Sequence, residues 1–367
     1  MSCHTVQKSD KGTPIAFELL SVNWIETEAV PTYHGWPTVV HAGNGRLVIV
    51  CSGTRKVHVD PFGKVVMYES CDGGLTWSAP RVLANGPLDD RDAGILVTPA
   101  GTWLVNYFTS LAFVSHCTKE NIPADWKAVE DQLTLSTIRA EHGFFMLRSE
   151  DQGRTWSEKY PVPVNNVHGP IVLQDGSLFF CGRGHFDTCL ARSTFADEIV
   201  SYRSTDDGKT WEEISRYFNG DFEGQNLRCW HELHSVQASD GTIITQIRNA
   251  SSHQSTWQME SRDGGKTWQN LRYICEGFPS HLLKLPDNRL LMSYGYRKEN
   301  FGNRCRISSD NGQSWSEEFI LSEGAPSADL GYPSTAVLDD GTLVTVWYEW
   351  RPELNIASLR CARWRLK

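Results

Sequence analysis

Short apolar segments with a two-residue period alternate with polar, glycine-containing turns along the whole chain. Residues 64–68 (Lys-Val-Val-Met-Tyr) are typical, and this period predicts a β-strand with one buried face. Pairs of such segments are repeatedly joined by a tight turn that contains Gly or Asn, which predicts β-hairpins. The six turns lie at residues 44–45, 100–101, 175–176, 240–241, 287–288 and 340–341.

A motif of eight residues, Ser-x-Asp-x-Gly-x-Thr/Ser-Trp, follows each of the first five predicted hairpins. The copies, called Asp boxes below, begin at Ser70, Ser149, Ser204, Ser261 and Ser308. Ser and Asp side chains satisfy the amides of a tight turn, Gly adopts a conformation that other residues resist, and Trp packs beneath the strands. We therefore expect a second hairpin at each Asp box.

Each hairpin and the Asp-box hairpin after it would form a four-stranded sheet, the repeating unit of a β-propeller. The sixth hairpin has no Asp box after it, and the strand-like segment 15–20 is expected to complete that blade and close the ring. The predicted fold class is therefore all-β, a six-bladed β-propeller in which residues 1–367 form a single domain.

The long interval between residues 109 and 141 indicates an insertion in the second blade. Residues 121–133 have an early Pro and then helical spacing, which predicts a short helix. Because the insertion follows the second strand of its blade, we expect it on the face that carries the candidate site described below. It would form a rim or lid there, or be an excursion without a role in the site.

Composition narrows the possible partners and compartments. The net charge is −9 and no run of Lys or Arg is present, so nucleic acid and acidic membrane surfaces are not expected partners. No apolar stretch is long enough for a membrane span or a signal peptide, which predicts a cytoplasmic protein unless a signal was trimmed. The 10 cysteines include no C-x-x-C pair, so neither a metal site nor a cofactor is predicted.

The positions of the turns predict that the two faces of the propeller carry different kinds of residues. The hairpin turns and the Asp boxes lie at one end of each blade, so the starts of first strands and the ends of second strands meet at the opposite face. Polar residues are concentrated there: His34, Arg55, Asp60, Arg91, Asp92, His168, Arg183, Glu232, His234, Arg248, His281, Arg297 and Tyr332. Several arginines in an acidic chain indicate an anionic ligand, because a guanidinium matches a carboxylate in charge and shape. For any single residue, a rim ion pair or a loop hydrogen bond is the alternative.

With these residues the chain resembles the sialidase (neuraminidase) superfamily. The Asp boxes are typical of its fold, and three further stretches match its spacing of catalytic residues. These are Glu232, Asp240-Gly241 and Arg248; Tyr332, Asp340-Gly341 and Tyr348-Glu349; and Arg55 with Asp60.

The resemblance implies a specific chemistry. Tyr332 would be the nucleophile, Glu232 would take its phenolic proton, and Asp60 would protonate the leaving oxygen. A neutral Tyr is a better nucleophile than a carboxylate beside an anionic anomeric centre, and sialidases are an exception to the use of paired carboxylates. Arg55, Arg248 and either Arg297 or Arg304 would bind the substrate carboxylate.

The sequence departs from the family pattern in two places. The first arginine of the family is missing, because the stretch that carries it reads Gly35-Trp36-Pro37 here. Arg91 or Arg183 of neighbouring blades would have to replace it, which would shift the carboxylate and imply a different sugar. Tyr332 is followed by Pro333 instead of a small residue, which leaves its role open.

Three functions fit these observations. The first is a sialidase-like exo-glycosidase that hydrolyses a terminal acidic sugar from a glycan, so that the partner is a carbohydrate with a carboxylate. The second is a lyase or rhamnosidase-type enzyme on uronate-containing glycans, which would use the histidines of the same face. The third is a glycan-binding propeller without catalysis, since one fold hosts many functions.

Overall fold

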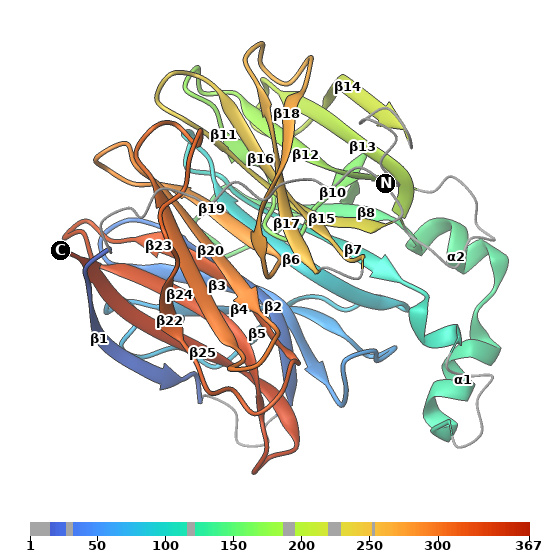
Figure 1. Cartoon of the computed structure of the whole chain (residues 1–367). Helices are drawn as coiled ribbons and strands as arrows, with labels where there is room; N and C mark the ends of the chain where they lie inside the picture. Colours follow the sequence, from blue (N-terminus) through green and yellow to red (C-terminus); the bar gives the residue numbers. More distant parts are fainter. Residues whose placement is uncertain (1–14, 27–31, 116–121, 186–194, 219–228, 252–253) are drawn as a thin grey trace, which may run out of the picture.

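Six antiparallel sheets arranged in a ring form the molecule (Figure 1). The computed structural model describes residues 15–26, 32–115, 122–185, 195–218, 229–251 and 254–367. Each sheet is one blade, and in blades 1, 2, 4 and 5 the strands lie in the order in which they follow along the chain. The predicted six-bladed, all-β architecture is confirmed.

The strand bounds follow the predicted pairs of hairpins. Blade 1 contains β2 (Tyr33–His41), β3 (Leu47–Arg55), β4 (Lys64–Ser70) and β5 (Arg81–Ala84), and blade 2 contains β6 (Asp89–Val97), β7 (Trp103–Ser110), β8 (Phe144–Ser149) and β9 (Tyr160–Pro161). Blade 3 contains β10 (Val164–Asn165), β11 (Ile171–Val172), β12 (Leu178–His185), β13 (Phe195–Ser204) and β14 (Glu212–Phe218), and blade 4 contains β15 (Trp230–Gln237), β16 (Ile243–Asn249), β17 (Ser255–Ser261) and β18 (Gln269–Glu276). Blade 5 contains β19 (Ser280–Lys284), β20 (Leu290–Tyr296), β21 (Gly302–Ser308) and β22 (Phe319–Ser322).

Blade 6 combines the two ends of the described chain. It contains β23 (Leu330–Val337), β24 (Leu343–Arg351), β25 (Ile356–Leu366) and β1 (Phe17–Trp24). β1 pairs antiparallel with β25, from Phe17 opposite Leu366 to Trp24 opposite Arg360. Figure 1 shows the blue strand beside the red one. The prediction that an early strand completes the last blade is confirmed.

The Asp boxes form tight turns held by their own side chains. In the copy that begins at Ser149, the amide of Gly153 donates to Ser149 Oγ (2.8 Å). Ser149 Oγ donates in turn to Asp151 Oδ1 (2.8 Å), and Thr155 donates its amide to Oδ1 (2.9 Å) and its hydroxyl to Oδ2 (2.6 Å). The amide of Gly73 in the first box donates to Gly45 O (3.1 Å), so the box and the first hairpin turn share one face.

The core lies between blades. In the described residues, six hydrophobic clusters each combine side chains of two neighbouring blades, and together they close the ring. The Asp-box tryptophans pack into these clusters; Trp156 of blade 2, for example, contacts the cluster that contains Val50 and Trp103. Burial of large aromatic and aliphatic side chains between sheets stabilises the ring as a whole.

The insertion in blade 2 contains more helix than the sequence pattern predicted. After a 3₁₀ turn at Ala112–Ser115, it forms α1 (Ala124–Gln132), as predicted, and α2 (Leu135–Glu141), which was not predicted. Thr134 caps α2 by accepting the amide of Thr137 (3.0 Å), so a Thr N-cap marked this helix. None of the helices in the described ranges is long and apolar enough to cross a membrane.

The insertion packs on the predicted face. Phe113 and Trp126 are buried against Leu88, which precedes β6, and Val59 of the β3–β4 loop packs against the same cluster. Lys56 in that loop forms an ion pair with Asp125 of α1 (2.8 Å). The helices therefore lie at the rim of the face opposite the Asp boxes.

Candidate active site

The inner strands of three blades contain the same distortion at the face opposite the Asp boxes. One extra residue bulges the strand between Gly35 and Thr38, between Arg91 and Gly94, and between Gly331 and Ser334. The bulges hold Trp36, Asp92 and Tyr332 with φ of 57°, 48° and 53°. A positive φ is costly for residues other than Gly, and such positions and bulges cluster at functional sites.

Tyr332, Glu232 and Arg248 come together from blades 6 and 4. The Tyr332 hydroxyl donates to Glu232 Oε1. Arg248 Nη1 donates to both carboxylate oxygens of Glu232 (2.8 and 3.1 Å) and to the Tyr332 oxygen (3.1 Å). The Arg248 guanidinium also lies 4.1 Å from the centre of the Phe278 ring, which fixes its position.

The surroundings give Tyr332 and Glu232 different protonation states. Burial and the nearby Glu232 charge raise the pKa of Tyr332 well above 10, so its phenol keeps its proton. Burial alone would raise the pKa of Glu232, but the Arg248 guanidinium, His231 and the hydrogen bond from Tyr332 lower it to about 2. The pair therefore consists of a neutral phenol and a carboxylate that can accept its proton.

Arg297, and not Arg304, lies at this cluster. Arg297 Nη2 donates to the Tyr348 hydroxyl (3.3 Å), and its guanidinium lies 5.6 Å from the centre of the Tyr332 ring. Arg304 is 3% exposed and donates to the carbonyl oxygens of Ser322 and Asn300. The structure thus resolves the predicted alternative in favour of Arg297, because Arg304 holds the backbone of its own blade.

Arg55 does not reach the site, contrary to the prediction. It is 1% exposed and pairs with Asp89, and it also donates to Asp90 O (3.0 Å). Trp36 separates Arg55 from the cluster, since the Arg55 and Arg91 guanidinium groups lie 5.3 and 4.3 Å from its ring centre. Gly35 stands where the family pattern has its first arginine, and Arg91 lies against the ring of the next residue, Trp36.

Asp60 is also placed differently from the prediction. It is fully buried and accepts backbone amides of its own loop, from Lys56 at Oδ2 (2.6 Å) and from Phe62 at Oδ1 (2.9 Å). These hydrogen bonds stabilise the β3–β4 loop and leave the carboxylate facing into it.

Asp92 faces a small cavity beside Glu232. The cavity has a volume of about 50 Å³ and is lined by Asp92, Phe108, Asn165, Asn166, Val167, Arg183, His231 and Glu232. No residue that the structure describes donates a hydrogen bond to Asp92 Oδ1, and the Arg91 Nε atom lies 4.0 Å from it. Arg183, which was predicted to bind substrate, lines the same cavity as Asp92 and Glu232. Its Nη1 atom donates to the carbonyl oxygen of Trp230.

A second polar network was missed by the sequence reasoning. The Tyr33 hydroxyl donates to both oxygens of Asp329 (3.0 and 2.9 Å), and the Tyr348 hydroxyl donates to Oδ1 (3.2 Å). His58 Nδ1 lies 3.1 Å from the same oxygen. Asp329 precedes Tyr332 by three positions, and this proximity to the predicted nucleophile was the available signal.

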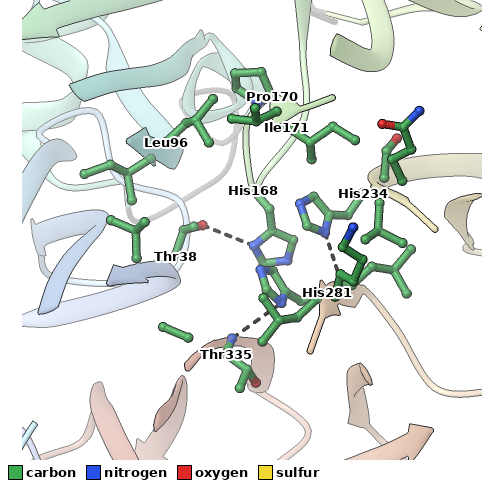
Figure 2. Close-up of a pocket in the computed structure, with 18 of the residues that line it drawn as sticks. Thr38, Leu96, His168, Pro170, Ile171, His234, His281 and Thr335 are labelled. Atoms are coloured by element: carbon green, nitrogen blue, oxygen red, sulfur yellow. Dashed lines mark hydrogen bonds between the residues drawn. The ribbon is translucent and has the colours of Figure 1, made fainter. Parts of the chain in front are cut away.

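His168, His234 and His281 line the central channel instead of the site face. Their rings lie 4.6–5.1 Å apart, and they line a cavity of about 480 Å³; Figure 2 shows the three side chains together among its lining residues. This cavity continues along the inner strands towards His41, Gln237 and Lys284 near the Asp-box face. The three were predicted to bind substrate. The structure places them along this channel, and Tyr332 is not among the residues that line it.

Each of these histidines is tied to a neighbouring strand. His234 Nδ1 accepts the amide of Leu282 (2.9 Å), His281 Nδ1 accepts the amide of Thr335 (3.4 Å), and His168 Nδ1 lies 3.1 Å from Thr38 Oγ1 (Figure 2). Burial lowers the pKa of all three, that of His281 to about 3, so they stay neutral.

His34 is likewise structural. It is buried inside blade 1, with Nδ1 2.9 Å from Thr32 O and Nε2 2.9 Å from the Tyr68 hydroxyl. Within the described residues, no group of three or more His, Cys, Asp or Glu side chains is arranged to hold a metal ion.

Comparison with known proteins agrees with the propeller fold. Residues 125–345 match the model of the BNR repeat-like domain family. A curated sialidase of Bacteroides fragilis (strain YCH46) is 25% identical over 214 residues, which cover 49% of this chain and 38% of the relative. The match thus spans well under half the length of that relative.

Solved structures show the same architecture. A protein of unknown function from Dyadobacter fermentans superposes with a TM-score of 0.74 at 21% identity, over 96% of this chain and 99% of its own. The NanB sialidase of Streptococcus pneumoniae superposes with a TM-score of 0.66 at 14% identity, over 94% of this chain and 70% of its own. The sialidase of Trypanosoma rangeli gives 0.58 at 16% identity, over 94% and 58%. With more than half of its length matched by the family model, the chain belongs to the BNR repeat-like domain family and has the propeller fold of sialidases.

Proposed function

We propose that this protein is a sialidase-like exo-glycosidase that hydrolyses a terminal acidic sugar, sialic acid or a related sugar, from a glycan. The observation that carries the proposal is the contact of the Tyr332 hydroxyl with Glu232, both held by Arg248. A phenol beside a carboxylate base, under an arginine, is suited to attack an anomeric carbon next to a carboxylate.

The arginines supply the affinity for the acid. Arg248 and Arg297 both lie against Phe278, and Arg297 also lies over the Tyr332 ring. Arg91 lies against Trp36 on the other side of the cluster. A substrate carboxylate between these groups would receive charge-assisted hydrogen bonds, each worth roughly 1.5–3 kcal/mol.

The protonation states support nucleophilic catalysis. The raised pKa of Tyr332 keeps it neutral until the substrate is bound, so it does not repel the substrate carboxylate. Glu232 takes the phenolic proton as the Tyr332 oxygen bonds to the anomeric carbon. The low pKa of Glu232 ensures that it is ionised at neutral pH.

Hydrolysis of a panel of aryl glycosides of sialic acid and related acidic sugars tests the proposal. The wild-type protein is expected to release the aryl alcohol, and Tyr332→Phe is expected to lose most of this activity while retaining its fold. Circular dichroism and thermal melting of both proteins provide the control. Absence of release from every member of the panel would rule the proposal out.

The other two functions predict different outcomes, each with its own measurement. A lyase would release an unsaturated uronate that absorbs in the ultraviolet, but the histidines that motivated it line the central channel. A binding propeller without catalysis would bind the acidic sugar and never turn it over.

A further inference from the structure

The proposed reaction needs a proton donor that Tyr332 and Glu232 do not supply. The phenolic proton of Tyr332 passes to Glu232, whose pKa of about 2 makes it a poor acid for a leaving alcohol. A third group must therefore protonate the glycosidic oxygen, and the same group must later deprotonate water.

Asp60, the residue at the family position, is not placed for this task. Both of its oxygens accept backbone amides of the β3–β4 loop, and the residue is 0% exposed. Because the folded loop covers this carboxylate, the substrate has no route to it.

Asp92 occupies in blade 2 the position that Tyr332 occupies in blade 6. Both follow the first residue of the same one-residue bulge in an inner strand, and both have a left-handed backbone. The amide of Asp92 donates to Ser52 Oγ (2.9 Å), which anchors the bulge to blade 1. The Asp92 charge contributes to the raised pKa of Tyr332, and Asp92 shares a cavity with Glu232, the partner of Tyr332, so the two bulges present their side chains to the same space.

The Asp92 carboxyl is free to exchange a proton. It is mostly buried, no described residue donates a hydrogen bond to its Oδ1 atom, and it shares a cavity with Glu232. The charged groups near it are Arg91, Arg55, Asp89 and Glu232, together with Arg183 and His231 in the cavity wall.

The surroundings of Asp92 raise the fraction of its acid form near neutral pH above that of an ordinary aspartate. Burial raises its pKa to about 6, where the Arg91 guanidinium opposes the rise and the Glu232 charge adds to it. A carboxyl with this pKa is matched to proton transfer at the pH at which most enzymes work.

We infer that Asp92, and not Asp60, is the general acid and base of the proposed hydrolysis, an assignment that rests on the proposed function. In the first step the Asp92 carboxyl gives its proton to the glycosidic oxygen as the bond from that oxygen to the anomeric carbon breaks. The Tyr332 oxygen forms its bond to the same carbon, and its phenolic proton goes to Glu232.

In the second step the Asp92 carboxylate takes a proton from water. The hydroxide oxygen bonds to the anomeric carbon, the bond from that carbon to the Tyr332 oxygen breaks, and Glu232 returns the proton to Tyr332. The cavity of about 50 Å³ between Asp92 and Glu232 has room for a few water molecules. Each group thus ends the cycle in its starting protonation state.

The dependence of kcat/KM on the leaving group, measured for Asp92→Asn, tests the inference. Asn tolerates the left-handed backbone at this position, so the fold is expected to survive. kcat/KM is expected to fall by about 10²–10⁴ for unsubstituted phenyl glycosides, which need the acid, and far less for dinitrophenyl glycosides, which do not. The wild type is expected to show a decline of kcat/KM above about pH 6, and this decline should disappear in the variant.

Asp60→Asn is the matched comparison, because it removes a carboxylate from the neighbouring loop. Its activity is expected to change by the same factor for every leaving group. A uniform loss in Asp92→Asn, or a leaving-group dependence in Asp60→Asn, would overturn the assignment and leave the proposed function standing. If the wild type hydrolyses none of the glycosides, the proposed function fails and the role of Asp92 fails with it.

Azide provides a second, independent measurement. In Asp92→Gly, which fits the same backbone and opens space, azide is expected to attack the Tyr332-bound sugar without help from a base. Formation of a glycosyl azide with restored turnover supports the role of Asp92. Turnover of dinitrophenyl glycosides by Asp92→Gly that azide leaves unchanged would contradict it.

Discussion

Arg55 and Arg248 have the same side chain and were predicted to bind the same carboxylate, yet their surroundings give them different tasks. Arg55 is 1% exposed and its charge is matched by Asp89, so it links the end of β3 to the start of β6. Arg248 has a side chain that is 19% exposed and contacts both Tyr332 and Glu232. Burial and pairing, more than residue type, decide which arginine can meet a ligand.

This difference predicts a loss of stability, without a defect in carboxylate binding, when Arg55 is replaced. Arg55→Met leaves the buried Asp89 with Arg91 as its remaining cationic partner (3.4 Å), and the free energy of unfolding is expected to fall by about 3 kcal/mol. Arg55→Met combined with Asp89→Leu removes both charges and should recover much of the loss. Urea unfolding followed by tryptophan fluorescence measures both effects. Equal destabilisation in the single and double variants would show that the pair is not the cause.

The sequence predicted the residues of the site whose roles depend on spacing along a strand. Glu232, Arg248 and Tyr332 are brought together because the spacing places them at the same end of their blades. Asp60 was assigned because it follows Arg55 as the loop Asp of the family does, and His168 was assigned by its position near that end. Whether a side chain faces the site, its own loop or the channel depends on bulges and loop hydrogen bonds that no residue pattern revealed.

At the scale of elements, the Asp-box turns form the second hairpin of blades 1 to 5. Each is held by the side chains of its own eight residues, so it forms from local sequence and was predictable. The inner-strand bulges were not predictable, because the extra residue is revealed only by the pairing of two strands. The second helix of the insertion was overlooked although Thr134 caps it.

The Asp boxes predict a dependence of stability on acid. Burial would raise the pKa of Asp206, but hydrogen bonds from Thr210 and Ser204 lower it to about 2. Because the folded pKa lies below the unfolded value, this stabilisation is present above about pH 4 and is lost as the pH falls towards 2. Asp206 accepts the Thr210 amide at Oδ1 and the Thr210 hydroxyl at Oδ2, and Asp206→Asn keeps only one of these two oxygens, so it should melt at a lower temperature at pH 7.

Thermal melting between pH 7 and pH 2 checks this expectation. The difference in melting temperature between wild type and Asp206→Asn should shrink as the pH falls below about 4. Glu158→Gln, a charge removal at an exposed position beside another Asp box, is the control. A difference that stays constant over this range would show that ionisation of Asp206 is not involved.

At the scale of the whole molecule, the ring is closed by strand pairing between the two ends of the described chain. β1 covers the edge of β25, and Phe17 packs against Phe319 and Trp364 with ring centres 5.1 and 6.0 Å apart. The clusters between blades form a closed circuit in which each blade supports two others. This arrangement followed from counting hairpins and Asp boxes in the sequence, and it is confirmed.

Removal of β1 is therefore expected to affect every blade. A protein that begins at residue 27 lacks the partner of β25 and the burial of Phe17, which contributes up to roughly 1.5–3 kcal/mol. We expect a lower melting temperature and association through the exposed β25 edge, measured by calorimetry and light scattering. A protein that begins at residue 15 is the matched comparison. Identical melting of the two would show that the sixth blade does not need β1.

The closure by β1 also has a consequence for synthesis. Of the described strands, β1 leaves the ribosome first and its partner β25 leaves last, so β1 must wait until all five other blades have been translated. At about 5–20 residues per second, a chain of 367 residues takes on the order of 20–70 s. During that interval five blades can form and stack, while the apolar side of β1 stays available to chaperones. Completion of the ring thus waits for the synthesis of β25.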